Sequence, residues 1–250
     1  DKFFRRFSKV ERLREIRVLK GFTRLRPGDD AVEVKADCSS GEDWLPACEL
    51  YGEGVFVQFD TEVLSDWQSS NAGVLSRRCG PLFEGLEKSG IGETARALPD
   101  PRFVLLHTFA HFLMIQLSKE CGYAVSSLRE RIYAQPIPSE VAGVLIYTAA
   151  GDSQGGMGGL MEAGAVDRLS LTILRAVELA TWCSSDPVCR EIGGPGGAQL
   201  SNASCHACAY LPETCCPHFN VLLDRMLLVG DQSASGLGFF ESLIRDSALT

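Results

Sequence analysis

Residues 141–150, VAGVLIYTAA, are an apolar run that decides the fold class of this chain. A short run without charges, rich in Val, Ile and Tyr, is typical of a strand that is buried on both faces of a sheet. Such a sheet needs helices to cover it, and helical patterns flank the run on both sides in the sequence. We therefore expect an α/β fold, a buried-strand sheet with long amphipathic helices.

The flanking helices are predicted from apolar spacing. One covers 103–120, with Gly122 placed for a C-terminal cap. A second, short helix is expected after it, where Ser126 or Ser127 would form a capping box with Glu130. A glycine-rich loop follows the strand at 151–159. Further helices are predicted at 167–182 and 219–229.

The first hundred residues have a different pattern. Residues 44–59 alternate as in a β-hairpin that turns near 52–54, and a short helix is expected at 60–67. Residues 69–100 are rich in Ser, Gly and charge, which indicates a connector. No run of eighteen apolar residues occurs, so we expect no membrane span and no membrane partner.

Charge is distributed unevenly along the chain. Residues 1–26 hold ten Lys or Arg and three acidic residues, a net charge of +7, whereas the whole chain has −8. The spacing of Val10, Leu13, Arg14 and Arg17 fits a helix with a solvated basic face. A basic arm on an acidic body is also typical of contact with nucleic acid or with an acidic partner.

Ten cysteines are present, and six of them fall between residues 183 and 216. Cys205 and Cys208 form a C-x-x-C pair, behind Cys183 and Cys189 and ahead of Cys216. Two such pairs supply the four thiolates that a structural zinc ion needs. Clustered rather than dispersed cysteines favour a reducing compartment, so we expect a cytoplasmic protein.

Alternatives to a zinc site stay open from the residues alone. The cysteines can be buried free thiols, or the C-x-x-C pair can be a redox pair. Which four of the five bind metal is undecided, and His206 and His218 flank the cluster as further candidate ligands.

Two other patterns carry possible chemistry. Residues 151–155, GDSQG, match the G-x-S-x-G elbow of serine hydrolases, with Ser153 as the nucleophile. The glycines that follow disfavour the helix that this elbow requires. His107 and His111 stand four residues apart, as in helical metal sites, but the Glu of the zincin motif is absent between them. We favour structural histidines that bridge the helix to neighbouring elements, and a position near a nucleic-acid or partner surface is the main alternative.

Several motifs follow one another in a recognisable order. They are LLHTFAH at 105–111, ECGY at 120–123, SLRERIY at 127–133, GVLIYT at 143–148, DPVC at 186–189, SCHAC at 204–208, LPETCC at 211–216 and NVLLDR at 220–225. With these motifs the chain resembles the C-terminal zinc-binding region of the DrmB family. That family comprises the helicase-associated proteins of DISARM phage-defence systems, and its zinc-binding domain is similar to that of MrfA-like DNA-repair helicases.

The resemblance implies a non-catalytic subunit or domain that assists a helicase ATPase on DNA in the bacterial cytoplasm. It implies a zinc-binding domain at 101–250, after a region at 1–100 that we expect to hold the basic helix, the hairpin and the connector. Cysteine ligands are implied at Cys183, Cys189, Cys205, Cys208 and Cys216. The chain lacks a Walker A motif, so ATP hydrolysis is expected in a partner. A pure protein-interaction module without DNA contact is the remaining alternative.

The residues that we expect to contact DNA or the partner are mostly arginines. They are Arg5, Arg6, Arg12, Arg14, Arg17, His107, His111, Arg129 and Arg131.

Overall fold

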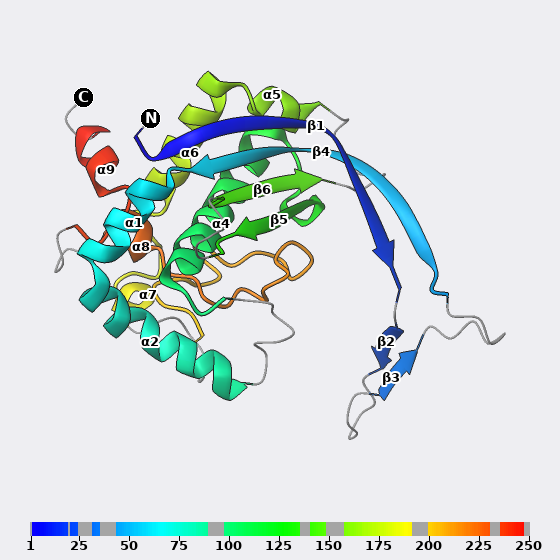
Figure 1. The fold of residues 1–250 in the computed structure, drawn as a ribbon, viewed down its shortest axis with the longest axis horizontal. Coiled ribbons are helices and arrows are strands. Elements are labelled where there is room, and N and C mark those ends of the chain that lie inside the picture. The colour runs from blue at the N-terminus through cyan, green and yellow to red at the C-terminus, as the bar shows by residue number, and fades with distance from the viewer. Residues whose placement is uncertain are drawn as a thin grey trace.

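A four-stranded antiparallel sheet is the centre of the structure, a computed structural model (Figure 1). The described residues are 2–19, 21–24, 32–35, 44–89, 98–135, 141–148, 158–191, 200–230 and 236–247. In spatial order the strands of the sheet are β1 (Phe4–Val18), β4 (Ala47–Phe59), β6 (Gly143–Thr148) and β5 (Leu128–Tyr133). A separate pair is formed by β2 (Gly21–Arg24) and β3 (Val32–Lys35).

The helices pack mainly around one long central helix. They are α1 (Thr61–Ser70), α2 (Ala72–Ser89), α4 (Pro101–Cys121), the 3₁₀ turn η1 (Val125–Ser127), α5 (Gly159–Ala163), α6 (Val166–Leu179), α7 (Val188–Glu191), α8 (Met226–Val229) and α9 (Glu241–Ser247). Helix α4 contacts β5, β6, α5, α6 and α8. It therefore connects the sheet with the C-terminal half of the chain.

Local signals explain how α4 begins and ends. The Asp100 side chain accepts a hydrogen bond from the N–H of Arg102, and Pro101 occupies the first turn, where its missing N–H costs nothing. Gly122 ends the helix in the left-handed conformation, with φ of 74°. Every residue from Phe103 to Met114 is buried, so the helix is enclosed on all sides over this length rather than along one stripe.

An aromatic cluster joins the two ends of the described chain. Phe3 and Phe4 pack against Phe240, with ring centroids 5.1 and 5.7 Å apart. Phe59 and Phe109 complete the cluster from β4 and α4. Strand β1 is thereby held against the core even though it forms the edge of the sheet.

Several predictions from local pattern are confirmed. The helices expected at 103–120 and 167–182 are α4 and α6, and the helix expected at 60–67 is α1, capped by Asp60. The buried strand is β6, and the α/β class holds.

The predicted basic helix is wrong, because Phe4–Val18 is the edge strand β1, paired with β4 over nearly its whole length. The predicted hairpin at 44–59 is also wrong, since β4 is one continuous strand. Gly54 lies where a Cβ would come within 2.6 Å of the Ile146 carbonyl oxygen. This glycine serves close contact between strands rather than a turn.

Three further local predictions are corrected. The connector at 69–100 contains the 18-residue helix α2. The segment around Glu130 is strand β5 rather than a helix. The helix predicted at 219–229 is reduced to α8, because Phe219 and Leu222 adopt positive φ values of 53° and 56°, which a right-handed helix excludes.

The sheet combines strands from both sides of residue 100, since β4 pairs with β6. The division of the chain into two domains at that point stays a prediction. Among the described helices, none has both the length and the apolar character that crossing a bilayer requires.

Candidate metal centre

Four cysteine side chains converge at the C-terminal side of α6. The sulfur atoms of Cys183, Cys189, Cys205 and Cys208 all lie within 4.8 Å of one another. Three Sγ···Sγ distances are short: 3.6 Å between Cys183 and Cys205, and 3.8 Å from Cys208 to both Cys189 and Cys205. These distances are far too long for disulfides.

The spacing fits a tetrahedral zinc ion. With Zn–S bonds of about 2.3 Å, the sulfur atoms of a tetrahedral site lie about 3.8 Å apart. Backbone N–H groups also point at the sulfurs, as for Ser185 toward Cys183 and Ala207 toward Cys205, both at 3.4 Å. Such donors stabilise thiolates. Burial raises the pKa of Cys205, but these and neighbouring hydrogen bonds outweigh burial and leave that pKa below its usual value.

Two short segments supply the ligands. Cys183 follows α6 directly, and Cys189 lies in the single turn of α7. Cys205 and Cys208 come from the loop before α8, where the N–H groups of Cys208 and Ala209 donate to the Cys205 carbonyl. This tight turn aims both thiols of the C-x-x-C pair at the same point.

A buried ion pair fixes the turn between Cys183 and Cys189. Asp186 accepts a hydrogen bond from the N–H of Cys183 and forms an ion pair with Arg225. Arg225 is fully buried and also donates to the Ala180 carbonyl oxygen at 3.2 Å. Four thiolates around Zn²⁺ have a net charge of −2, so a guanidinium close to them is electrostatically favourable. Sequence reasoning missed Asp186 and Arg225, since only their positions in space connect them with the cysteines.

Comparison with known proteins agrees with this geometry. Residues 109–209 match the MrfA Zn-binding domain. The chain is also 39% identical, over 97% of its length, to the DISARM protein DrmB of Bacillus paralicheniformis.

The resemblance to DrmB proteins that the motifs indicate is therefore confirmed, and the zinc-binding domain match together with the four-cysteine cluster supports a structural zinc ion. The chain spans 44% of the length of that relative. The four cysteine side chains would hold the ion, and a closed site with four thiolates has no open position for a substrate.

Four of the five predicted cysteine ligands lie together in the four-sulfur cluster. Cys216 is not in the four-sulfur cluster but lies with His107, His111 and Glu130, and the ligand atoms of this second group also lie within 4.8 Å of one another. His206 is exposed and packs against the Tyr210 ring. The four-sulfur cluster contains no histidine.

The second group, which we call the His–Glu–Cys cluster, is entirely buried. Burial lowers the pKa of His107 to about 4, so this imidazole is neutral near pH 7. Burial also raises the pKa of the Cys216 thiol.

Of the residues predicted to contact DNA or a partner, the structure buries the two histidines and exposes most of the arginines. His107 and His111 have no exposed surface, so the expectation that they contact DNA or a partner directly is wrong. The helical spacing of these two residues places them in the core instead. The exposed arginines are Arg5, Arg6, Arg12, Arg14, Arg17 and Arg131, and Arg129 is half-buried.

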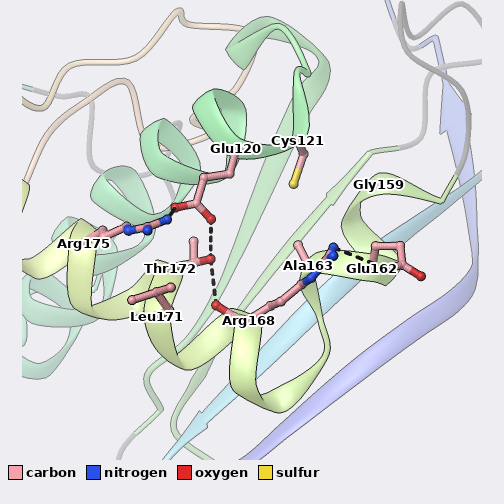
Figure 2. Close-up of a pocket in the computed structure, with 9 residues that line it drawn as sticks. All are labelled: Glu120, Cys121, Gly159, Glu162, Ala163, Arg168, Leu171, Thr172 and Arg175. Carbon is pink, nitrogen blue, oxygen red and sulfur yellow. Dashed lines mark hydrogen bonds and ion pairs between the residues drawn. The ribbon is translucent and has the colours of Figure 1, made fainter.

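A pocket of about 470 Å³ lies where α4, α5 and α6 meet (Figure 2). Its charged side chains are already paired: Glu120 accepts hydrogen bonds from Thr172 at 2.6 Å and Arg175 at 3.0 Å. Arg168 pairs with Glu162 at 3.3 Å. Burial raises the pKa of Cys121, which keeps this thiol protonated and weakly nucleophilic. These contacts hold α6 against α4.

The serine of the hydrolase alternative, Ser153, lies outside the described residues, as does the rest of 151–157. Gly158, directly after them, donates its N–H to the buried carboxylate of Glu53 at 2.8 Å. Glu53 also accepts hydrogen bonds from Tyr123 and from the N–H of Leu160. These hydrogen bonds fix the backbone at Gly158 and Leu160 against Glu53.

Proposed function

We propose that this chain is a non-catalytic, zinc-stabilised part of an anti-phage defence protein that works beside a helicase ATPase on DNA. The observation that carries the proposal is the similarity over 97% of the chain to a protein named DISARM protein DrmB. The closed four-thiolate site supports a structural rather than a catalytic use of zinc. The nine described cysteines form no disulfides with one another, which supports a location in the cytoplasm.

The outer face of the sheet supports DNA contact. Arg129 and Arg131 flank Glu130, whose side chain contacts α4, and successive strand residues point to opposite faces. The two arginines therefore lie on the face away from α4. The register places Arg6 of β1 on the same face, in one row with Tyr133 of β5 through Gln58 and Gly143.

This outer face combines charge with aromatic rings. The Arg131 guanidinium lies 5.7 Å from the centre of the Tyr133 ring, which in turn meets Phe56 edge to face at 5.7 Å. Arginines bind phosphates, and aromatic rings on an open sheet stack with unpaired bases. The combination fits single-stranded DNA next to a helicase.

A projecting ribbon supports a protein partner. Strand β6 pairs with β4 only from Glu53 to Gln58, so Ala47–Gly52 and Leu13–Val18 pair with each other alone among the described strands. Figure 1 shows both strands continuing past the rest of the sheet. Large apolar side chains are exposed on and beside this ribbon: Ile16, Val18, Leu19, Trp44, Leu45 and Tyr51.

The ribbon favours protein over DNA because its charges are already balanced. Arg14 pairs with Glu49 at 2.6 Å, and Arg17 pairs with Glu15. Arg12 lies over the ring of Tyr51. An exposed apolar group with compensated charges is typical of a protein interface. We infer that the helicase partner binds the ribbon and that DNA binds the outer face of the sheet.

DNA binding by the purified protein with its helicase partner tests the proposal. Arg129→Ala/Arg131→Ala should weaken binding of fluorescently labelled single-stranded DNA. Loss of two phosphate contacts on single-stranded DNA should reduce the slope of log K against log salt by about 1.4. Arg77→Ala/Lys88→Ala, which removes two charges from α2, is the matched control and should leave the slope unchanged.

Co-purification with the helicase separates the alternatives. Ile16→Ser/Val18→Ser should abolish association with the helicase while the zinc content stays the same. If the complex forms but the arginine pair and its control bind DNA equally, the chain is a protein-interaction module without DNA contact.

A further inference from the structure

We propose that the His–Glu–Cys cluster of His107, His111, Glu130 and Cys216 is a second structural zinc site, separate from the four-cysteine site. All four side chains are fully or almost fully buried, and their ligand atoms lie within 4.8 Å of one another. Two imidazole nitrogens, one carboxylate oxygen and one thiolate are a donor set that zinc binds readily. The inference is independent of the function proposed above.

The contact distances within the cluster agree with ligands that surround one ion. His107 Nε2 lies 3.1 Å from Glu130 Oε1 and 3.2 Å from Cys216 Sγ. His111 Nε2 lies 3.4 Å from the same Glu130 oxygen. In a tetrahedral zinc site with such donors, neighbouring ligand atoms are about 3.3–3.6 Å apart.

The tautomer of His111 is the strongest argument for a cation. Its Nδ1 lies 2.8 Å from the Ala209 carbonyl oxygen, which can only accept, so Nδ1 carries the proton. In the neutral ring Nε2 then bears a lone pair, and this lone pair faces a carboxylate oxygen. His111 Nε2 and Glu130 Oε2 are both buried without a hydrogen-bond partner. A metal ion between these atoms turns the repulsion into two coordinate bonds.

The charge balance points the same way. Without an ion, the Glu130 carboxylate is buried with one of its oxygen atoms, Oε2, lacking any hydrogen-bond partner, which is costly. Zn²⁺ with one carboxylate and one thiolate has a net charge of zero. The hydrogen bond from His111 Nδ1 to a backbone carbonyl is also the usual way in which proteins orient a metal-binding histidine.

The two sites would share one loop. Cys205 and Cys208 hold its first part at the four-cysteine site, and Cys216 holds its end at the His–Glu–Cys cluster. His111 also binds the carbonyl of Ala209, the residue after Cys208. A second ion would thus fasten this loop to α4 and β5, on the inner face of the sheet.

Metal content and X-ray absorption of the purified protein test this proposal. We expect two zinc ions per chain, with an average coordination of about 2.5 sulfur and 1.5 nitrogen or oxygen atoms per zinc. One zinc per chain with sulfur ligands alone, in protein prepared with excess zinc, would overturn the proposal. This measurement needs no variant and so does not depend on the folding of a mutant.

Neighbouring cysteines provide a matched pair of variants. Cys216→Ala should bind one zinc ion fewer per chain and shift the average coordination toward sulfur alone. Cys215→Ala removes an equally buried thiol whose Sγ contacts the Val125 carbonyl oxygen, and it should keep both ions. If Cys216→Ala folds and still binds two zinc ions with an unchanged absorption spectrum, Cys216 is not a ligand and the proposed site is wrong.

Discussion

The ion pair between Arg225 and Asp186 stabilises the backbone around the four-cysteine site. Arg225 has no exposed surface, and its partner Asp186 also orients the backbone at Cys183. Asp186 therefore links a charge in the core with the first zinc ligand. A charge in such a position is tolerated only while its partner is present.

Replacing Arg225 by Met should therefore destabilise the protein by about 3 kcal/mol, because the Asp186 carboxylate would lose its principal partner. Arg190→Met is the control, since Arg190 lies 3.9 Å from the same carboxylate and is partly exposed. It should cost less than about 1 kcal/mol. Urea unfolding with saturating zinc measures the loss of unfolding free energy in both variants. Equal losses would show that Arg225 has no special role.

At the same scale, the cysteine spacing was sufficient to predict a zinc site, because a C-x-x-C turn is a local structure. The His–Glu–Cys cluster was not predicted. Its members come from a helix, a strand and a distant loop, and Glu130 was interpreted as a helix cap. Glu130 reaches the two histidines only because its side chain points from strand β5 toward helix α4.

Among the elements, those with strong local signals were predicted correctly. Helix α4 has a capping Asp and a terminal glycine, and β6 is a continuous apolar run. Strand β1 was not predicted, because its basic residues are equally compatible with the exposed face of a helix. Its conformation is determined by pairing with β4, about forty residues away, which no local pattern contains.

Close packing between β4 and β6 gives a test at this scale. Gly54→Ala should destabilise the protein by about 1–3 kcal/mol, because the new methyl group would meet backbone atoms of β6 at 2.6 Å. Gly73→Ala on α2 meets only the end of the Arg77 side chain at 3.8 Å and should be neutral or stabilising by up to about 1 kcal/mol. Thermal unfolding of both variants measures the difference, and similar midpoints would contradict the strand packing.

For the whole molecule, zinc connects segments that the sheet does not hold. The four cysteines bring the segment at the end of α6 and helix α7 together with the segment 200–208. Without the ion, no metal–sulfur bonds would link the four cysteine side chains. The cysteines form a small buried cluster of their own, separate from the main apolar core, so a bound ion would contribute stability there that apolar packing supplies elsewhere.

Removal of zinc by a chelator should lower the melting temperature and increase hydrogen exchange first in residues 183–191 and 200–216. Strand β6 and helix α4 should stay protected for longer, since their hydrogen bonds lie within the core. Added zinc should restore protection, whereas added magnesium should not. Unchanged exchange in both segments after verified zinc loss would exclude a structural role.

The pairing of β4 with β6 has a practical consequence for expression of fragments. The stretch that matches the MrfA Zn-binding domain, 109–209, includes β5 and β6 but ends before Cys216 and omits β4. A fragment cut at these limits would leave one side of β6 as a bare hydrogen-bonding edge, which invites self-association. The limits of the domain match and those of an autonomously folding fragment thus differ in this protein, and a fragment that is to stay monomeric has to begin upstream of β4.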